Sequence, residues 1–286
     1  MGTLANKIDF AVILSVKNAN PNGDPLNGNR PRETYDGIGE ISDVCIKRKI
    51  RNRLMDMGQP VFVQSDDKRA DGFKSLKERA DSVDELKKTK DSELYAKVAC
   101  EKWMDVRSFG QVFAFKGNDV SVGVRGPVSV HPAFSVDPID IASIQITKSV
   151  NSVTGDKKSS DTMGMKHCVP FGVYVFYGSI NCQLAEKTGF TEEDAELIRD
   201  ALISLFENDS SSARPDGSME ICKVFWWKHN CKTGQYSSAK VHRSLHIVPI
   251  EGKKAPGGNL PFRMEDYYTV TVDTLDGLSS EIYDGI

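Results

Sequence analysis

The sequence predicts an α+β fold, in which buried strands alternate with amphipathic helices. Residues 8–16 carry apolar side chains at every second position. Ala11 and Ile13 make the other face partly apolar, which is typical of a central strand covered on both sides. Apolar residues at helical spacing follow Ser42, and the continuous apolar stretch 170–180 predicts a second buried strand.

Composition sets the broad class of the protein. The chain has 286 residues, enough for a single domain with large insertions. Its formal net charge of −3 excludes a protein that coats nucleic acid through bulk positive charge, so any such site must come from local clustering. We find no apolar run of membrane-spanning length and no signal-peptide core, and therefore expect no membrane partner. The six cysteines lack framework spacing, so we expect a reduced, cytoplasmic protein.

The first predicted strand leads into a loop, residues 18–32, that is rich in Asn, Gly and Pro. Pairs such as Asn22-Gly23 and Asn27-Gly28 favour turns, so we expect no regular element there. Ser42 then predicts the N-cap of a helix that ends near Gly58. Strand, loop and helix together form a βα opening.

Residues 66–105 differ in composition from the rest of the chain. Twenty-one of these forty positions are charged, eleven acidic and ten basic, which indicates a solvated helical excursion and not core. We take 61–105 as a helical insertion. Residues 103–115 are expected to form a helix, and 120–134 alternates well enough for a strand or a hairpin.

A second segment of unusual composition, 147–166, is rich in Ser, Thr, Gly and Lys. It predicts a projecting hairpin or a mobile surface loop, to which we assign the bounds 145–168. Further along, Thr191 and Asp194 predict a capping box at the start of a helix, and 219–229 predicts a third buried strand. Without the two insertions the order is close to β-α-β-β-α-β, the ferredoxin-like pattern that RNA-recognition domains share.

The sharpest local feature is a cluster of five basic residues within seven positions of the first predicted helix. Such an array can place several cationic groups along a phosphate backbone while the apolar stripe of the helix packs on the sheet. Arg30 and Arg32 lie just before the same helix and strengthen this interpretation. The alternative is a solvated basic face. The members of the cluster are Lys47, Arg48, Lys49, Arg51 and Arg53.

Aromatic residues on the strand at 170–180 form a second candidate group. Tyr174, Phe176 and Tyr177 resemble the base-stacking aromatic residues of RNA-recognition domains. Aromatic residues on a central strand are more often core, and we favour that alternative for these three side chains.

The predicted hairpin supplies a third group. Met163 and Met165 are suited to wedge against bases or a neighbouring subunit, with Lys148 and Lys166 close by in the sequence. The alternative is an ordinary flexible loop with solubilising lysines.

Catalytic and metal-binding motifs are not found in the sequence. There is no Walker loop, no G-x-S-x-G and no H-E-x-x-H. Cys222 and Cys231 do not have the spacing of a zinc knuckle, and His242 and His246 lie in a strand-like stretch. We therefore expect no metal and no cofactor.

Several blocks of the sequence occur in the order found in one known family. They are NPNGDPLNGNRPR, SDVCIKRKIRN, DVRSFGQVFAF, VRGPVSVHPAF and PFGVYVFYGSIN. Together they resemble the backbone subunit of the type I-C CRISPR Cascade surveillance complex, the Csd-two type of Cas family seven in the RAMP superfamily. The resemblance runs from the first strand to about Asn181 and is weaker beyond it.

The resemblance implies a modified ferredoxin-like or RNA-recognition (RRM) palm, a helical insertion called the fingers and a protruding β-hairpin called the thumb. It implies that copies stack head to tail along a CRISPR RNA (crRNA) guide and present it to a target DNA strand, beside other Cascade subunits, in bacterial antiviral defence. It also implies that the subunit is not a nuclease. We accordingly predict that RNA is bound by Asn22, Asn27, Arg30, Arg32, Lys47, Arg48, Lys49, Arg51, Arg53, Lys148, Met163, Met165 and Lys166.

The main alternative is a ribonuclease of the same superfamily that processes guide RNA or cuts target RNA. Such an enzyme needs a general acid–base pair or a positioned aspartate beside the scissile phosphate, for which His167 and Asp161 are the candidates. A small-molecule enzyme on a ferredoxin-like scaffold is a further alternative, but the sequence has no cofactor loop to support it.

Overall fold

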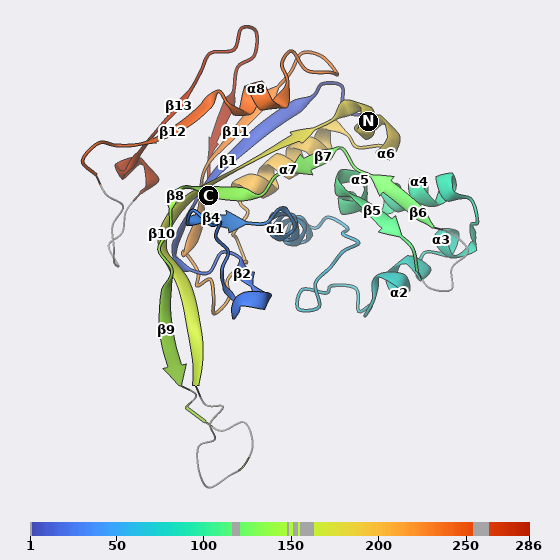
Figure 1. Cartoon of the computed structure of the whole chain (residues 1–286). Coiled ribbons are helices and arrows are strands. Elements are labelled where there is room, and N and C mark those ends of the chain that lie inside the picture. The colour runs from blue at the N-terminus through green and yellow to red at the C-terminus, as the bar shows by residue number, and fades with distance from the viewer. Residues whose placement is uncertain (1, 116–120, 148, 151–153, 155–162, 254–262) are drawn as a thin grey trace.

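A computed structural model describes residues 2–115, 121–147, 149–150, 154, 163–253 and 263–286. Within these residues an eight-stranded antiparallel sheet forms the centre of the molecule (Figure 1), which confirms the α+β class. Its main path runs β14-β11-β1-β10-β8-β4, and β7 and β9 also pair with β10. The strands of this sheet are β1 (Ile8–Ala19), β4 (Ile38–Ile41), β7 (Val128–Val130), β8 (Ala133–Pro138), β9 (Ala142–Thr147), β10 (Met163–Ile180), β11 (Met219–Lys228) and β14 (Glu281–Asp284).

The central strand β1 confirms the alternation read from the sequence. It lies between β10 and β11, so that Val12 is opposite Phe176 on one side and Val224 on the other. The alternate positions from Ile8 to Val16 are buried in one hydrophobic cluster, while Ala11 and Ile13 belong to a second cluster on the other face. Layers on both sides of the sheet therefore exclude water from β1.

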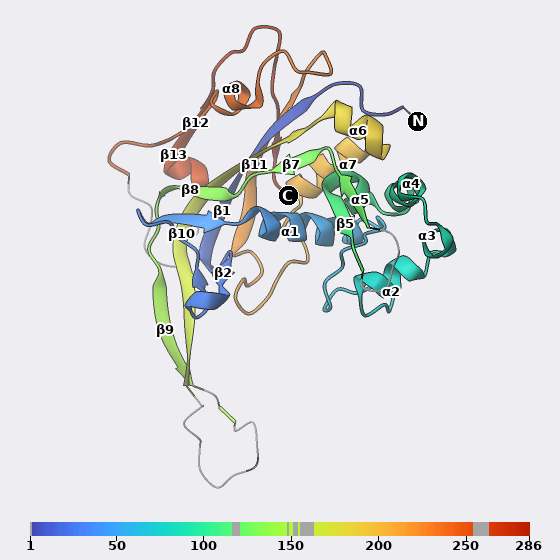
Figure 2. The same cartoon turned by 45° about the vertical axis from the view of Figure 1, so that its right-hand side comes forward.

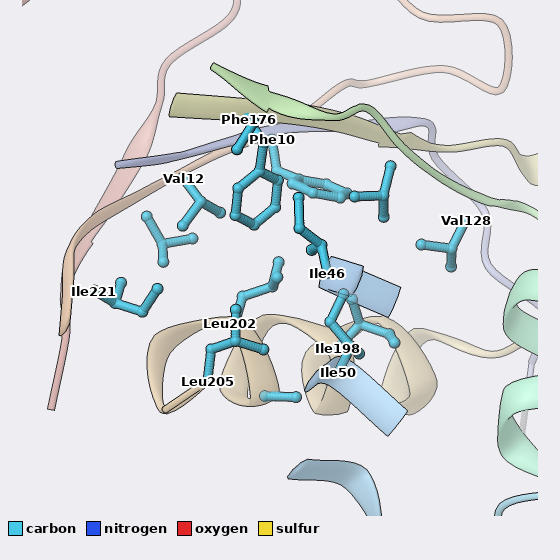
Figure 3. Packing of buried hydrophobic residues seen from close by; sticks show 14 of the residues in the cluster. Phe10, Val12, Ile46, Ile50, Val128, Phe176, Ile198, Leu202, Leu205 and Ile221 are labelled. Atoms are coloured by element: carbon cyan, nitrogen blue, oxygen red, sulfur yellow. The ribbon is translucent and has the colours of Figure 1, made fainter. Parts of the chain in front are cut away.

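Two helices, α1 (Asp43–Asp56) and α7 (Glu192–Ile203), cover one face of the sheet. Both begin where the sequence predicts: Ser42 caps α1, and Thr191 forms a capping box with Asp194 at α7. Side chains from both helices meet the sheet in one continuous core (Figure 3). Those labelled include Phe10, Val12, Ile46, Ile50, Phe176, Ile198, Leu202 and Leu205.

The second face of the sheet is covered by a segment that we call the cap, residues 236–253 and 263–278. Trp227 of β11 packs under it, whereas its neighbour Trp226 belongs to the core on the helical face. Figures 1 and 2 show α8 and the two-stranded ribbon β12–β13 lying over this face. The sequence placed His242 in a strand-like stretch, but the structure has it at the end of a helix. The cap contains α8 (Ser238–His242), β12 (Leu245–Pro249), the short 3₁₀ helix η3 (Met264–Asp266) and β13 (Tyr268–Val272).

The charged insertion has a core of its own, contrary to our expectation. Its sparse apolar side chains converge around Phe62, Trp103 and Phe113, because the short helices turn their apolar positions toward one another. We call this part, residues 61–115 and 121–125, the side lobe. It comprises α2 (Leu76–Asp81), α3 (Asp84–Lys88), α4 (Ser92–Lys102), α5 (Met104–Phe109), β5 (Gly110–Phe113) and β6 (Val122–Arg125).

The stretch 103–115, expected to be a helix throughout, changes from helix to strand at Gly110. This residue ends α5 with a φ of 81°, and a Cβ there would lie 2.3 Å from the carbonyl oxygen of Val124. Only glycine fits so close to the paired strand. The side lobe joins the rest of the chain through ion pairs from α5, including one between Arg107 and Asp194 at 2.7 Å.

Strand β9 and the outer part of β10 form a hairpin that extends away from the sheet in both views (Figures 1 and 2). The loop after β1 lies near its base and contains short elements that the sequence analysis did not expect. They are β2 (Gly23–Asp24), the 3₁₀ turn η1 (Pro25–Asn27) and β3 (Arg30–Pro31). A further short helix, α6 (Cys182–Thr188), follows β10. No helix among the described residues has both the length and the apolar character needed to cross a bilayer.

Candidate nucleic-acid interface

The basic cluster of α1 is engaged in contacts within the chain. Lys47 pairs with Asp43 one turn earlier, with a distance of 3.0 Å between Nζ and Oδ2. Arg48 donates a hydrogen bond from Nη1 to the backbone oxygen of Val63, at 2.6 Å. The first of these contacts is local, whereas the second joins α1 to the side lobe.

Two members of the cluster are largely buried. Lys49 is 4% exposed and pairs with Asp209 in the loop after α7. Arg51 donates from Nε to Asp105, 2.9 Å away, and Asp105 is fully buried in α5. An unpaired charge in such surroundings is strongly disfavoured, so these carboxylates account for the position of both cations.

The last member, Arg53, lies against the C-terminal end of α7. Its Nε donates to Ser204 Oγ at 2.7 Å, and its guanidinium also pairs with Glu207. The sequence analysis weighed phosphate binding against a solvated face, and the structure supplies a third role. These cations attach α1 to α7, to the side lobe and to the loop after α7, and their contact with RNA stays a prediction.

The loop before α1 is held in place by its asparagines. Asn22 Oδ1 accepts hydrogen bonds from both the backbone amide and the hydroxyl of Ser42, each at 2.9 Å, which ties the loop to the start of α1. Arg32 lies 3.5 Å from Asp24. Asn27 is exposed at the end of the 3₁₀ turn. Of the predicted RNA ligands in this loop, Asn22 therefore has a structural role and Asn27 is free to contact a partner.

Arg30 connects this loop to the base of the hairpin. Its Nη1 donates to Ser143 Oγ at 3.0 Å, and the same hydroxyl lies 2.8 Å from His167 Nδ1. The structure thus brings together two regions that the sequence analysis had considered separately. His167, the histidine candidate for ribonuclease chemistry, therefore has the Ser143 hydroxyl as its hydrogen-bond partner. Asp161, the other candidate, lies outside the described residues.

The hairpin separates residues that we had grouped together. Met163 and Met165 are opposite Thr147 and Gln145 on one face, while Lys166 lies on the other face because side chains alternate along a strand. Both methionines are more than half exposed. They share their face with the Ser143–His167 pair that Arg30 contacts, whereas Lys166 shares its face with Ile144 and Ile146. Lys148 lies outside the described residues.

The aromatic residues of β10 are unavailable for base stacking. Tyr174 and Phe176 are 0% exposed in the core between the sheet and its helices. Tyr177 lies on the opposite face, where its ring stacks on His242 of the cap at 4.9 Å between centroids. The structure supports the core alternative that we favoured, since both faces of the strand are covered.

A buried polar cluster lies beneath the cap, around Asp9 of β1. The Asp9 carboxylate accepts hydrogen bonds from His229 Nε2 at 2.8 Å and from Lys7 Nζ at 2.9 Å. Burial raises the pKa of Asp9, but the hydrogen bonds, that from His229 first, outweigh it and leave the pKa lowered. Burial lowers the pKa of His242, which contacts the Gly178 carbonyl oxygen at 3.1 Å. Of these groups His242 belongs to the cap, and its contact with Gly178 joins the cap to β10.

Candidate metal ligands are dispersed in the described part of the chain. No three His, Cys, Asp or Glu side chains there gather closely enough to hold an ion. Cys222 lies in β11, where burial raises the pKa of its thiol to about 12, so it stays protonated at neutral pH.

Both the sequence and the fold are similar to those of known proteins. A Cas7 protein of Haloferax volcanii, described as "CRISPR-associated protein Cas7", is 25% identical over 228 residues, which is 73% of this chain and 67% of that protein. A solved chain of a "CRISPR RNA-guided surveillance complex, pre-nicking" matches 87% of this chain and 80% of its own length, with a TM-score of 0.50 and 14% identity. At that identity the match bears on the fold alone. The profile of the family "CRISPR-associated protein Cas7" matches residues 6–273, nearly the whole chain, and the protein therefore belongs to the Cas7 family.

Proposed function

We propose that this chain is a non-catalytic backbone subunit that binds the crRNA guide of a type I-C Cascade complex in the bacterial cytoplasm. The observation that carries the proposal is the family match over residues 6–273. The name of the structural neighbour describes an RNA-guided surveillance complex, which agrees with this role. In the proposed assembly, copies stack head to tail beside other Cascade subunits. They expose short runs of guide bases to a target DNA strand in antiviral defence.

We assign the parts of such a subunit to the observed elements. The sheet with α1 and α7 is the palm, and the chain order β1-α1-β8-β10-α7-β11 supports an RRM-like arrangement. Residues 61–105, within the side lobe, are the fingers, and 145–168 are the thumb, of which residues 148, 151–153 and 155–162 lie outside the described part of the chain. In RNA-recognition domains an open sheet face stacks on bases, but here the cap covers that face. We therefore place the RNA outside the sheet, along the loop before α1 and the hairpin.

The Arg30 contact favours this path. It joins the loop to the hairpin face that carries Met163 and Met165. Loop and hairpin face together form one continuous surface with cationic and apolar groups. Cations in the loop are suited to phosphates, and exposed thioether side chains are suited to the faces of bases. Because the whole chain has a net charge of −3, binding depends on such local positive charge.

The proposal is tested by expressing the chain together with its guide RNA. We expect purified wild-type protein to carry RNA of regular length, seen as a raised ratio of absorbance at 260 and 280 nm, with several copies per RNA by light scattering. A double variant with Met163→Glu and Met165→Glu places negative charge beside the phosphates and should lose assembly. Val248→Glu in the cap is the matched control, since Val248 and Met165 are about equally exposed, at 55% and 54%. A wild-type chain that purifies as an RNA-free monomer contradicts the proposal.

The ribonuclease alternative is tested separately with His167→Ala. We expect guide RNA to stay intact with both the wild type and this variant, as judged by denaturing gel electrophoresis. Cleavage by the wild type that His167→Ala abolishes would support the ribonuclease instead.

A further inference from the structure

A pocket of about 300 Å³ lies where the cap meets β8 and β10. Three segments that are distant in the sequence line it: the end of β8, the middle of β10, and the cap around the end of β12 and the start of β13. Figures 1 and 2 both show β13 close to β8 at this place. Ligand pockets hold roughly 300–1,000 Å³, so this one is suited to a single long side chain or a small molecule.

Asp137 gives the pocket a negative charge. The Tyr268 hydroxyl donates a hydrogen bond to Asp137 Oδ2 at 2.8 Å. Burial raises the pKa of Tyr268, and the hydrogen bond to Asp137 and the charge of that carboxylate raise it further, so the hydroxyl stays protonated. Among the described residues, the half-buried carboxylate takes part in no ion pair. A charge withdrawn from water is normally paired, so the pocket lacks a cation.

The backbone around Asp137 is held firmly in place. Ser135 Oγ donates to the carbonyl oxygen of Asp137 at 2.6 Å and accepts from the amide of Gly39 at 2.8 Å. The amide of Ile139 donates to the carbonyl oxygen of Gly37 at 2.9 Å. The carboxylate is therefore positioned before a ligand arrives, which reduces the entropy that binding costs.

Aromatic side chains form a wall of the same pocket. Phe171 and Tyr267 contact each other at 6.3 Å between ring centroids, and Tyr268 lines the pocket beside them. Cations are attracted to the faces of aromatic rings. A guanidinium group suits this combination best, because it stacks on rings and also donates two parallel hydrogen bonds to a carboxylate.

Lys253 is the other charged residue of the pocket lining within the described part of the chain. It lies on the exposed turn after β12 and forms no ion pair with Asp137. Water screens an exposed charge more than a half-buried one, so the carboxylate dominates inside the pocket. The two residues also make opposite demands on a ligand: a cation is attracted by Asp137 and repelled by Lys253, and an anion has the reverse preference.

We propose that this pocket binds an arginine side chain of a protein partner, with the guanidinium on the Asp137 carboxylate and against the aromatic wall. The inference goes beyond the proposed function, because the ligand belongs to a protein and not to the guide RNA. A nucleotide would bring phosphate charge toward Asp137, which disfavours RNA at this place. Arginine is enriched among the side chains that anchor protein interfaces, where a charge-complementary pocket receives them.

The test titrates the full chain with N-acetyl-arginine N-methylamide and with the corresponding citrulline compound, which has nearly the same shape and no charge. Isothermal titration calorimetry gives both affinities. We expect the arginine compound to bind about tenfold more tightly, the factor expected for one hydrogen bond between charged groups. Asp137→Asn keeps an acceptor for Tyr268 and should abolish the difference. Asp276→Asn, on an exposed cap residue outside the pocket, makes the same charge change and should retain it.

Lys253→Ala tests the sign of the charge preference independently. The residue is exposed, so the variant should fold as the wild type does. We expect a few-fold gain in affinity for the arginine compound, because a repelling charge is removed. A loss of affinity would mean that the pocket prefers an anion, and the inference would be wrong. This variant also decides the question if Asp137→Asn does not fold.

Three further outcomes would overturn the inference. The first is no binding of the arginine compound to the wild type, and the second is equal binding of the arginine and citrulline compounds. The third is binding of free arginine, with its charged amino and carboxyl groups, in the absence of binding by the blocked compound. That result would identify a site for a small molecule and not for a protein. None of these measurements involves RNA, so each outcome leaves the proposed function to be judged separately.

Discussion

The two halves of β10 have the same backbone conformation and opposite surroundings. The inner half, residues 169–180, pairs with β1 along its length and is mostly buried, while the outer half, 163–168, pairs only with β9 and is mostly exposed. The inner half reads VPFGVYVFYGSI, with apolar residues on both faces, and the outer half reads MGMKHC. One half of the strand is thus a core element, and the other half is a surface open to a partner.

The glycines of the two halves show what this difference means for packing. A Cβ at Gly178 would lie 2.1 Å from the ring of Phe10 and 2.5 Å from the backbone oxygen of Ser129. A Cβ at Gly164 would lie 3.5 Å from Ile146, an ordinary contact. Substitutions in the inner half should therefore change stability, and those in the outer half should change binding.

The largest expected effect is that of Phe176→Ala in the inner half. Phe176 is 0% exposed, so its loss leaves a cavity and should lower the free energy of unfolding by about 3–5 kcal/mol. Met165→Ala in the outer half should change it by less than about 0.5 kcal/mol. Urea denaturation of both variants measures the contrast, and similar losses would show that the outer half is packed as tightly as the inner.

A smaller effect is expected for Gly178→Ala, because an added methyl group has no room between Phe10 and the neighbouring strand. We expect a loss of about 1–3 kcal/mol, the usual range for overpacking. Gly164→Ala, in the same strand and with the same chemical change, is the matched control and should be nearly neutral. Thermal unfolding of the pair tests this, and equal melting temperatures would contradict it.

The next prediction concerns pH and the contact between the inner half and the cap. Burial lowers the pKa of His242, so below about 6.5 the unfolded chain takes up a proton that the folded chain resists. The contribution of His242 to stability is thus full above that pH and declines as pH falls below it. The lowered pKa of Asp9 acts in a separate window, below about 3.9.

Urea midpoints at pH 7.5 and pH 5.5 measure the His242 contribution. We expect a lower midpoint at pH 5.5 for the wild type. His242→Gln retains a donor for the Gly178 carbonyl and should show a smaller difference between the two conditions. An identical pH dependence in the variant would mean that another group is responsible.

The smallest expected effect is that of Arg30→Ala at the base of the outer half. Its hydrogen bond to Ser143 is exposed, so global stability should change by less than about 0.5 kcal/mol. Local order should still change, because the loop loses a link to the hairpin. We expect faster hydrogen exchange around residues 142–147 and unchanged exchange in β1. Unaltered exchange at the hairpin would show that Arg30 does not position it.

Local features of the fold follow from the sequence by itself. The alternation in β1 and the caps at Ser42 and Thr191 are confirmed, since each depends on residues within a few positions of one another. The charged insertion was recognised by composition, but its internal core was not. Charge density alone does not reveal whether the few apolar side chains of a segment meet.

The candidate site depended more on tertiary structure. The sequence identified the cations of α1, but their partners Asp105 and Asp209 are 54 and 160 residues away. The separation of Lys166 from Met163 and Met165 required the strand register. The pocket required three distant segments to meet. Periodicity and capping are properties of neighbouring residues, whereas ion pairs, pockets and covered faces depend on how the chain returns to itself, which only the tertiary structure decided.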